Sequence, residues 1–353
     1  MRGENRKIKG RGSHFNPPNR FESIERIPES DDGEPVCPAT RLLSDASRTL
    51  IAYNQSPDVG FDASINAYRG CEHGCAYCYA RPTHEYLGLS AGLDFETKIV
   101  VKRNAPALLR RELSHPRWKP KVLAMSGVTD PYQPIERKLK LTRGCLEVLL
   151  EFRNPVIVIT KNNGVARDLD LLSELAKFQA AAVFLSITTL DAGLCSMLEP
   201  RTSRPEKKLE AISALSKAGI QTGVMVAPVI PGLTDQEIPA IIQAATEAGA
   251  RFAGMIPLRL PLAVAPLFEA WLDTHLPGRK TKILNRIRSV RGGKLNDARF
   301  GSRMEGEGIF ADQMNALFEL ACKKTGIKEN NLALSTRHFQ SSSQEQLALF
   351  DIK

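Results

Sequence analysis

Several features that mark other classes of protein are missing from this sequence. It contains no run of about 18 apolar residues, the length that an α-helix needs to cross a bilayer. Residues 1–10 lack the apolar stretch of an export signal. The seven cysteines are an odd number, so they cannot all pair as disulfides. We therefore expect a protein of the reducing cytoplasm with no membrane partner.

Positive charge is in excess and is unevenly spread. The formal net charge is +9, and Lys and Arg residues gather in two segments, 1–20 and 279–303. Such clusters are typical of proteins that bind a polyanion such as nucleic acid. An ordinary solvated surface is the alternative, because the few aromatic residues, 6% of the chain, are not interleaved with the basic ones as base stacking would require.

Three cysteines lie close together in one short segment. Cys71, Cys75 and Cys78 have C-x3-C-x2-C spacing, and Gly74 relieves the backbone between them. Thiolates bind soft metals, chiefly zinc and iron–sulfur clusters. A closed zinc site or an ordinary four-thiolate cluster needs a fourth ligand, and no fourth cysteine lies nearby. The spacing favours a [4Fe–4S] cluster with one open iron; zinc completed by His73 or His84, or buried thiols without metal, are the alternatives.

A strand–helix rhythm follows, with apolar strands of the kind found in buried parallel sheets. Apolar residues at helical spacing follow Pro205, and Gly219 ends this predicted helix. Thr234 and Glu237 predict a capping box at the start of a second such helix, which Gly249 ends. The expected strands are 62–69, 121–127, 155–161, 182–189, 223–230 and 252–257, and the expected helices are 205–218, 235–248 and 309–323.

The chain divides into three expected parts. Residues 1–35 are polar, basic and rich in Gly and Pro, and they predict a disordered arm. Residues 36–278 form the α/β domain, whose length suits a barrel. Residues 279–353 form a basic extension with one helix and a polar tail.

The cysteine loop resembles that of the radical S-adenosylmethionine (SAM) superfamily, and six βα units match the partial (β/α)6 TIM-type barrel of its enzymes. The resemblance implies that Cys71, Cys75 and Cys78 hold a [4Fe–4S] cluster whose open iron chelates SAM. A reductant such as flavodoxin or ferredoxin would supply an electron, and SAM would yield a 5′-deoxyadenosyl radical that abstracts hydrogen from a substrate. The cofactors carry this chemistry, and the protein positions and shields them.

A narrower resemblance is to the spore photoproduct lyase-like division, in a bacterial branch called DNA repair photolyase-like that has no assigned substrate. It implies that Lys161 and Ser186 hold the SAM carboxylate and that Thr129 helps. Spore photoproduct lyase keeps a hydrogen-donating cysteine where this chain has Gly127, which argues against thymine-dimer reversal by the lyase mechanism. The resemblance rests on residues 68–79, 129–136, 199–202 and 228–232.

Polar residues at the C-terminal ends of barrel strands are candidates for cofactor binding, because the chemistry of such barrels sits there. The SAM carboxylate needs a cation or hydroxyl donors, and its amino group needs a carboxylate or carbonyl. The candidates that supply these groups are Thr129, Asp130, Lys161, Ser186 and Thr188.

Four further residues each have two interpretations. Tyr77 and Tyr79 shield the cluster or relay a hydrogen atom, and Cys195 donates hydrogen or is a small buried residue. Arg201 meets a substrate anion or pairs with Glu199.

We expect a radical SAM enzyme with nucleic acid as one substrate class. A nucleic-acid-binding protein with structural zinc, and a radical SAM enzyme acting on a peptide or small metabolite, are the alternatives.

Overall fold

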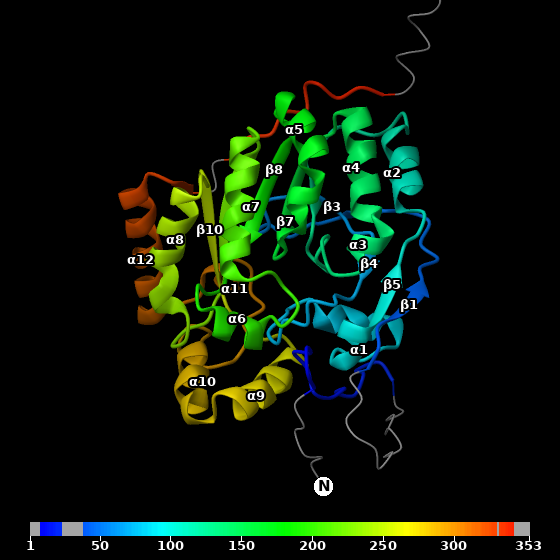
Figure 1. Ribbon diagram of the computed structural model, residues 1–353. Helices are drawn as coiled ribbons and strands as arrows, with labels where there is room; N and C mark the ends of the chain where they lie inside the picture. Colours follow the sequence, from blue (N-terminus) through cyan, green and yellow to red (C-terminus); the bar gives the residue numbers. More distant parts are fainter. Residues whose placement is uncertain (1–7, 23–37, 330–331, 342–353) are drawn as a thin grey trace, which may run out of the picture.

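The computed structural model describes residues 8–22, 38–329 and 332–341, and these residues are built around an eight-stranded sheet (Figure 1). Neighbouring strands from β3 to β11 are parallel, and β2 at one edge is antiparallel to β3. From edge to edge the strands are β2 (Ile51–Tyr53), β3 (Ala63–Ile65), β6 (Leu123–Met125), β7 (Val156–Thr160), β8 (Ala181–Ser186), β9 (Gln221–Val229), β10 (Phe252–Pro257) and β11 (Lys328–Glu329).

The six strands from β3 to β10 lie in chain order because helices connect each strand to its neighbour. All six residues of β8 are buried, as expected for a parallel strand covered on both faces. In Figure 1 the connecting helices stand in front of the strands. The expected α/β fold with successive βα units is confirmed. These helices are α2 (Ala105–Leu113), α4 (Leu141–Phe152), α5 (Leu169–Lys177), α7 (Pro205–Lys217) and α8 (Ile238–Glu247).

The first predicted strand, 62–69, is split in the structure. The chain leaves the large sheet after β3, and β4 (Tyr68–Arg69) pairs with β5 (Lys98–Val101) in a separate sheet that also contains β1 (Arg41–Ser44). This change of sheet turns the chain just before the cysteine loop. It places the loop at the C-terminal end of the barrel strands, beside α1 (Leu93–Thr97) and α6 (Ala192–Leu198) (Figure 1).

The predicted capping box at the start of α8 is wrong. The hydroxyl of Thr234 accepts from the backbone nitrogen of Ile230 at 2.9 Å. The Glu237 carboxylate instead accepts from the Thr189 hydroxyl and the Leu190 nitrogen, both at 2.7 Å. The loop after β8 thus supplies the hydrogen-bond donors for the Glu237 carboxylate, in place of the backbone nitrogens at the start of α8.

The C-terminal extension contains more structure than the one expected helix. Helix α12 (Ile309–Thr325) matches the prediction and packs along α8, but α10 (Lys280–Ser289) falls where a connector was expected. Its apolar stripe, Ile283, Leu284 and Ile287, is buried. Basic residues on its other faces hid this stripe in the sequence. The remaining helices are η1 (Arg81–Leu87), α3 (Glu136–Leu139), η2 (Asn163–Asp168), η3 (Asp235–Glu237), α9 (Val264–His275), η4 (Pro277–Arg279) and α11 (Ser302–Glu305).

The N-terminal segment also differs from its prediction. Residues 8–22 are packed against the domain, with Arg11 and Ser13 buried, rather than forming part of a disordered arm. The rest of the predicted arm, and most of the predicted polar tail, lie outside the described residues. Within the described ranges, no helix combines the length and the apolar character that crossing a bilayer requires.

Candidate active site

The three cysteines lie in the loop between β4 and η1. All three are free thiols, with Cys71 and Cys75 buried and Cys78 partly buried. The Cys71 backbone nitrogen donates to the Phe95 carbonyl at 2.9 Å, and the Ala76 nitrogen donates to the Leu198 carbonyl at 3.0 Å. The loop is therefore held from two sides by backbone hydrogen bonds.

The fully buried guanidinium of Arg81 supports the loop from within. Its Nε and Nη2 donate to the Cys75 carbonyl at 3.1 and 2.9 Å, and Nη2 also donates to Glu96 at 2.5 Å. Burial raises the pKa of the Cys78 thiol to about 11, and the charge of Arg81 opposes this rise. Arg81 thus favours the thiolate, which is the form that binds a metal.

Residues 8–22 form an outer wall behind the loop. Glu96 accepts from the backbone nitrogens of Gly12 and Ser13 at 3.1 and 2.8 Å, so one carboxylate joins this wall to Arg81. A Cβ atom on Gly12 would lie only 1.7 Å from the carbonyl oxygen of Gly74. The wall can approach the loop this closely only because residue 12 is glycine.

The segment after α6 closes over the opposite side of the loop. The Arg201 backbone nitrogen donates to the His73 carbonyl at 3.2 Å, and its guanidinium donates to Glu72 at 3.3 Å. The pairing of Arg201 with Glu199 considered from the sequence is therefore not formed. Arg201 fastens the loop instead.

Glu199 is the centre of a buried polar cluster that we call the Glu199 network. Its Oε1 accepts from the Lys161 ammonium at 3.0 Å and the Thr188 hydroxyl at 2.6 Å, and the Tyr77 hydroxyl also donates to it. Its Oε2 accepts from the Lys208 ammonium at 2.9 Å. The network consists of Tyr77, Lys161, Thr188, Glu199, Thr202 and Lys208.

The charges of the network stabilise one another. Burial alone would raise the pKa of Glu199, but Lys161 and Lys208 hold it well below its usual range. Burial alone would lower the pKa of Lys161, but Glu199 raises it above its ordinary value. Two lysines and one carboxylate leave an excess positive charge beside the cysteine loop, which suits an anionic group of a bound molecule.

The Lys161 ammonium, predicted to bind the SAM carboxylate, donates all its hydrogen bonds to protein groups. Besides Glu199 and Thr188, its ammonium donates to the Ala227 carbonyl at 2.9 Å, so all three of its hydrogens have an acceptor. The structure therefore brings Lys161, Thr188 and Tyr77 together at the strand ends. Binding of SAM by Lys161 and Thr188 stays a prediction.

Thr129 and Asp130 brace the site in this structure. The Thr129 hydroxyl donates to the Gly70 carbonyl at 2.5 Å. Asp130 accepts from the Thr160 hydroxyl at 2.6 Å and from the Lys161 backbone nitrogen at 2.8 Å, and it lies 3.4 Å from His73 Nδ1. Both side chains thus join the ends of β6 and β7 to the cysteine loop.

Ser186 differs from the other predicted cofactor-binding residues in its hydrogen bonding. It is the last residue of β8 and only 7% exposed. Its hydroxyl forms no hydrogen bond with any residue that the structure describes. The hydroxyl oxygen itself is accessible to solvent at this strand end, so it is available to bind a ligand oxygen. This geometry suits the predicted contact with the SAM carboxylate.

Tyr79 and Cys195 differ in their exposure to solvent. Tyr79 is 48% exposed, and the guanidinium carbon of Arg259 lies 4.8 Å from its ring centroid. Cys195 is buried, with its sulfur 4.0 Å from Glu199 Oε2 and 3.9 Å from the Ser203 carbonyl. Of the predicted radical-relay residues, Tyr77 is fixed in the network, Tyr79 reaches the surface, and Cys195 lies beside the carboxylate.

An ion pair joins the β2–β3 loop to α11, which packs against β10. Arg303, in α11, donates to Asp58, in the β2–β3 loop, through Nε at 2.7 Å. Arg303 also lies over the ring of Phe300, which is 63% exposed. The ion pair thus links parts of the chain that lie next to β2 and next to β10, toward opposite ends of the strand order.

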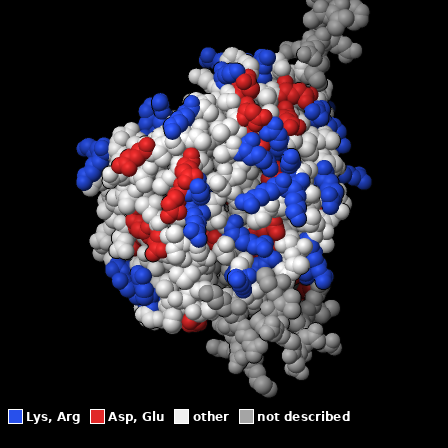
Figure 2. All heavy atoms as spheres, viewed as in Figure 1, with Lys and Arg blue, Asp and Glu red and all other residues white. Residues whose placement is uncertain are grey.

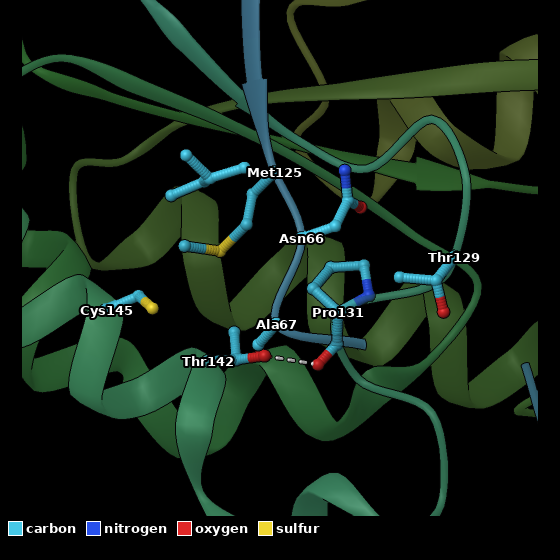
Figure 3. A pocket seen from close by; sticks show the side chains of 8 residues that line it. Asn66, Ala67, Met125, Thr129, Pro131, Thr142 and Cys145 are labelled. Atoms are coloured by element: carbon cyan, nitrogen blue, oxygen red, sulfur yellow. Dashed lines mark hydrogen bonds between the residues drawn. The ribbon is translucent and has the colours of Figure 1, made fainter. Parts of the chain in front are cut away.

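A small cavity of about 10 Å³ lies where β3 and β6 end (Figure 3). Thr129 and Cys145 are on its walls, and the Thr142 hydroxyl donates to the Pro131 carbonyl at 2.6 Å beside it. Such a volume holds no more than one water molecule. Cys145 is 1% exposed and packs in the core. Gly127, with φ of +103°, faces open space.

The geometry can now be compared with known proteins. A family model described as "Radical SAM superfamily" matches residues 65–245, more than half of the chain. This chain belongs to the radical SAM superfamily.

Several relatives share part of the sequence. An uncharacterized protein of Mycobacterium tuberculosis is 38% identical over 231 residues, which cover 64% of this chain and 68% of the relative. An uncharacterized protein of Methanocaldococcus jannaschii is 35% identical over 173 residues, covering 49% and 62%. A protein of Pseudomonas phage M6 named Radical SAM Nalpha-GlyT isomerase is 27% identical over 168 residues, covering 47% and 33%.

Solved structures of spore photoproduct lyase share the fold. One mutant superposes with a TM-score of 0.59 at 18% identity, covering 82% of this chain and 80% of the lyase. Another, with bound AdoMet and dinucleoside spore photoproduct, gives 0.59 at 15% identity over the same shares. The radical SAM barrel found here is therefore the fold of that enzyme.

The cysteine loop of this radical SAM chain suits the cofactors of the superfamily. Three free thiols occupy one loop, a buried arginine favours the thiolate form of Cys78, and the Ser186 hydroxyl is free at a strand end. The zinc alternative needed a histidine ligand beside these thiols. Within the described ranges, no three His, Cys, Asp or Glu side chains are placed to hold a single metal ion, and this holds for the three loop cysteines as well.

Both histidines near the loop have other contacts. His73 lies beside Asp130, and its Nε2 is 3.2 Å from the Asn162 side-chain nitrogen. His84 Nε2 lies 2.9 Å from the Lys98 carbonyl oxygen. The His73 ring also lies against the Cys71 thiol, whereas His84 is held by the backbone of Lys98.

Sequence reasoning missed several residues of the radical SAM site. Arg81, Glu96 and Gly12 support the loop through contacts between distant parts of the chain, for which the sequence carries no local signal. Lys208 did leave a signal, since it lies on the inward face of α7 with Ile212. A lysine on an apolar stripe indicates a buried partner, which is Glu199.

Proposed function

We propose that this protein cleaves SAM reductively at a [4Fe–4S] cluster held by Cys71, Cys75 and Cys78. A reductant such as flavodoxin or ferredoxin would supply the electron. When bound, cluster and SAM would supply a radical that removes hydrogen from a substrate. The observation that carries this proposal is the braced loop of three free thiols beside the excess positive charge of the Glu199 network.

Each part of the site has a role in this proposal. The Ser186 hydroxyl binds the SAM carboxylate, and the Lys161 ammonium joins it by exchanging its hydrogen bond to the Ala227 carbonyl for one to the ligand. Thr188 and Glu199 keep Lys161 in place meanwhile. Arg81 and residues 8–22 hold the loop closed from behind and exclude water from the thiols. Asp130 orients His73 and the end of β7.

Anaerobic reconstitution with iron and sulfide, followed by reduction in the presence of SAM, tests the proposal. We expect brown protein that releases 5′-deoxyadenosine. Cys78→Ser should abolish cluster binding and SAM cleavage, whereas Cys322→Ser, a matched change of a buried cysteine in α12, should keep both. Colourless protein, or SAM cleavage unaffected by Cys78→Ser, would contradict the proposal.

We further propose nucleic acid as the substrate class. The support is the surface beside the loop, where Tyr79 with Arg259, and Phe300 with Arg303, present aromatic rings and guanidinium planes of the kind that stack on bases. Gly127 leaves no thiol where spore photoproduct lyase keeps one, so the expected reaction is a different radical modification.

Deuterium transfer distinguishes this substrate class from a peptide or small metabolite. Oligonucleotides deuterated on their bases should pass the label into 5′-deoxyadenosine, and deuterated peptides should not. Arg259→Gln should weaken oligonucleotide binding without changing SAM cleavage in the absence of substrate. Label transfer only from peptides or metabolites would overturn the nucleic-acid assignment and leave SAM cleavage intact.

A further inference from the structure

A second pocket, with a volume of about 250 Å³, lies outside the barrel. It is bounded by the segment that leads from β9 into α8, by one face of α10 and by the first turns of α12. Its polar lining consists of Asp235, Gln236, Arg279, Lys282, Arg286 and Gln313. The proposed function assigns no role to this pocket.

Three cations face the pocket from one side. Arg279, Lys282 and Arg286 are spaced by three and four residues, so they lie on one face of the helical segment that includes α10. Asp235 is the one carboxylate among the lining residues, which leaves an excess of two positive charges. Figure 2 shows Lys and Arg side chains gathered at the lower left, where Figure 1 places α10 below α12.

These cations are held in place without being neutralised. Arg279 donates to the Gly232 carbonyl at 3.0 Å, and the guanidinium carbon of Arg286 lies 3.4 Å from the Phe310 ring centroid. Among the described residues, neither these two arginines nor Lys282 forms an ion pair. Neighbouring cations do, since Lys280 lies 2.7 Å from an Asp273 oxygen.

We propose that this pocket binds a phosphate group. Guanidinium planes match phosphate oxygens in pairs, and Lys282 adds a point charge. Helix α12 lines the same space with one side, and its Gln313 adds a side-chain amide that can donate to a phosphate oxygen. The pocket is larger than one phosphate needs, so it has room for the group that carries the phosphate, either a nucleic-acid backbone or a mononucleotide.

This site is separate from the cofactor site. The opposite face of α10, formed by Ile283, Leu284 and Ile287, packs in the same apolar cluster as Cys75 and Tyr77. Helix α10 is therefore a wall between the two sites. Because no lining residue touches the Glu199 network, the inference goes beyond the proposed function and does not depend on SAM cleavage.

Calorimetric titration of the full chain, reconstituted with its cluster, tests this inference. The probes are inorganic phosphate, adenosine 5′-monophosphate and a single-stranded 12-residue oligonucleotide. Lys282→Gln and Arg279→Gln should each weaken the binding of a phosphate probe about fivefold or more. Lys217→Gln, the same change at an exposed position in the last turn of α7, should leave binding within about twofold.

The probes also identify the source of the phosphate. A backbone ligand gives the oligonucleotide the highest affinity, and Lys282→Gln then lowers its salt dependence by about 0.7 in the log–log slope. A mononucleotide ligand gives the monophosphate equal or higher affinity. Absence of binding by every probe, or equal affinities in the pocket variants and Lys217→Gln, would overturn the inference. Neither result would affect SAM cleavage, which is measured separately.

Discussion

Lys208 and Glu199 form a buried ion pair, with 2.9 Å between Nζ and Oε2 and with each side chain at most 1% exposed. Lys208 approaches from α7, while Lys161 approaches the other carboxylate oxygen from the end of β7. Lys208 thus neutralises the Glu199 carboxylate from the helices outside the barrel, and Lys161 neutralises it from the strand ends.

Replacing Lys208 with Met should therefore be costly. Loss of one partner leaves a buried carboxylate less compensated, and such changes destabilise by about 3 kcal/mol. Urea unfolding of the cluster-free protein measures the loss. Lys207→Met is the matched control on the same helix, because Lys207 forms only an exposed pair with Glu210 and should cost under about 1 kcal/mol. Equal losses in the two variants would contradict a buried pair.

Gly12→Ala should detach the N-terminal wall from the cysteine loop. The added methyl group would overlap the Gly74 carbonyl, and relieving such a clash costs about 1–3 kcal/mol. Hydrogen exchange should show faster exchange at the amides of residues 12 and 13, which donate to Glu96. Gly60→Ala, where nothing lies near the added atom, should not change this exchange. Unaltered protection in Gly12→Ala would refute the close packing.

His84 should make stability depend on pH. Burial lowers the pKa of His84 from 6.5 to about 4 in the folded protein. The unfolded chain therefore binds a proton between pH 6.5 and pH 4 while the folded chain does not, so this contribution is complete above pH 6.5 and is lost as the pH falls toward 4. The loss is about 3 kcal/mol.

Chemical unfolding at several pH values measures this dependence. The fall in unfolding free energy from pH 6.5 to pH 4 should be smaller in His84→Gln than in the unmodified chain. His115→Gln, a change of an exposed histidine, should keep the full dependence. Parallel curves for His84→Gln and the unmodified chain would show that the histidine is not buried in its neutral form.

Ser186→Ala should weaken SAM binding about tenfold, because it removes a hydroxyl donor to a charged carboxylate. Equilibrium dialysis with the reconstituted protein measures the affinity, and product analysis follows 5′-deoxyadenosine. Ser173→Ala, at a solvent-facing position of α5, should bind SAM normally. An unchanged affinity in Ser186→Ala would remove this serine from the proposed site.

The sequence predicted those parts of the site that are encoded locally. The spacing of Cys71, Cys75 and Cys78 identified the loop, and apolar strand patterns placed Lys161 and Ser186 at neighbouring strand ends. These signals are readable because alternation and loop spacing act over a few residues. The predicted strand ends differ from the observed ones by a few residues, most clearly at 62–69, where the chain passes from one sheet to another.

Contacts between distant segments could not be predicted in the same way. Arg201 was expected to meet an anion or Glu199, yet it pairs with Glu72, 129 positions away. Arg291 belongs to a basic cluster in the sequence, but it is buried and donates to the backbone carbonyls of Pro257 and Leu258. Charge alone does not distinguish a cation that binds a ligand from one that holds the fold together.

The contact between Asp58 and Arg303 has a consequence for how this protein can diverge from its relatives. Both residues lie outside 65–245, the stretch that defines the superfamily, and so does Gly12. The shared stretch therefore contains the proposed cofactor residues, whereas the contact between Asp58 and Arg303 is made by its flanks. A relative with different flanks could keep the same reaction and admit molecules of another size, so substrate range can evolve without touching the thiols.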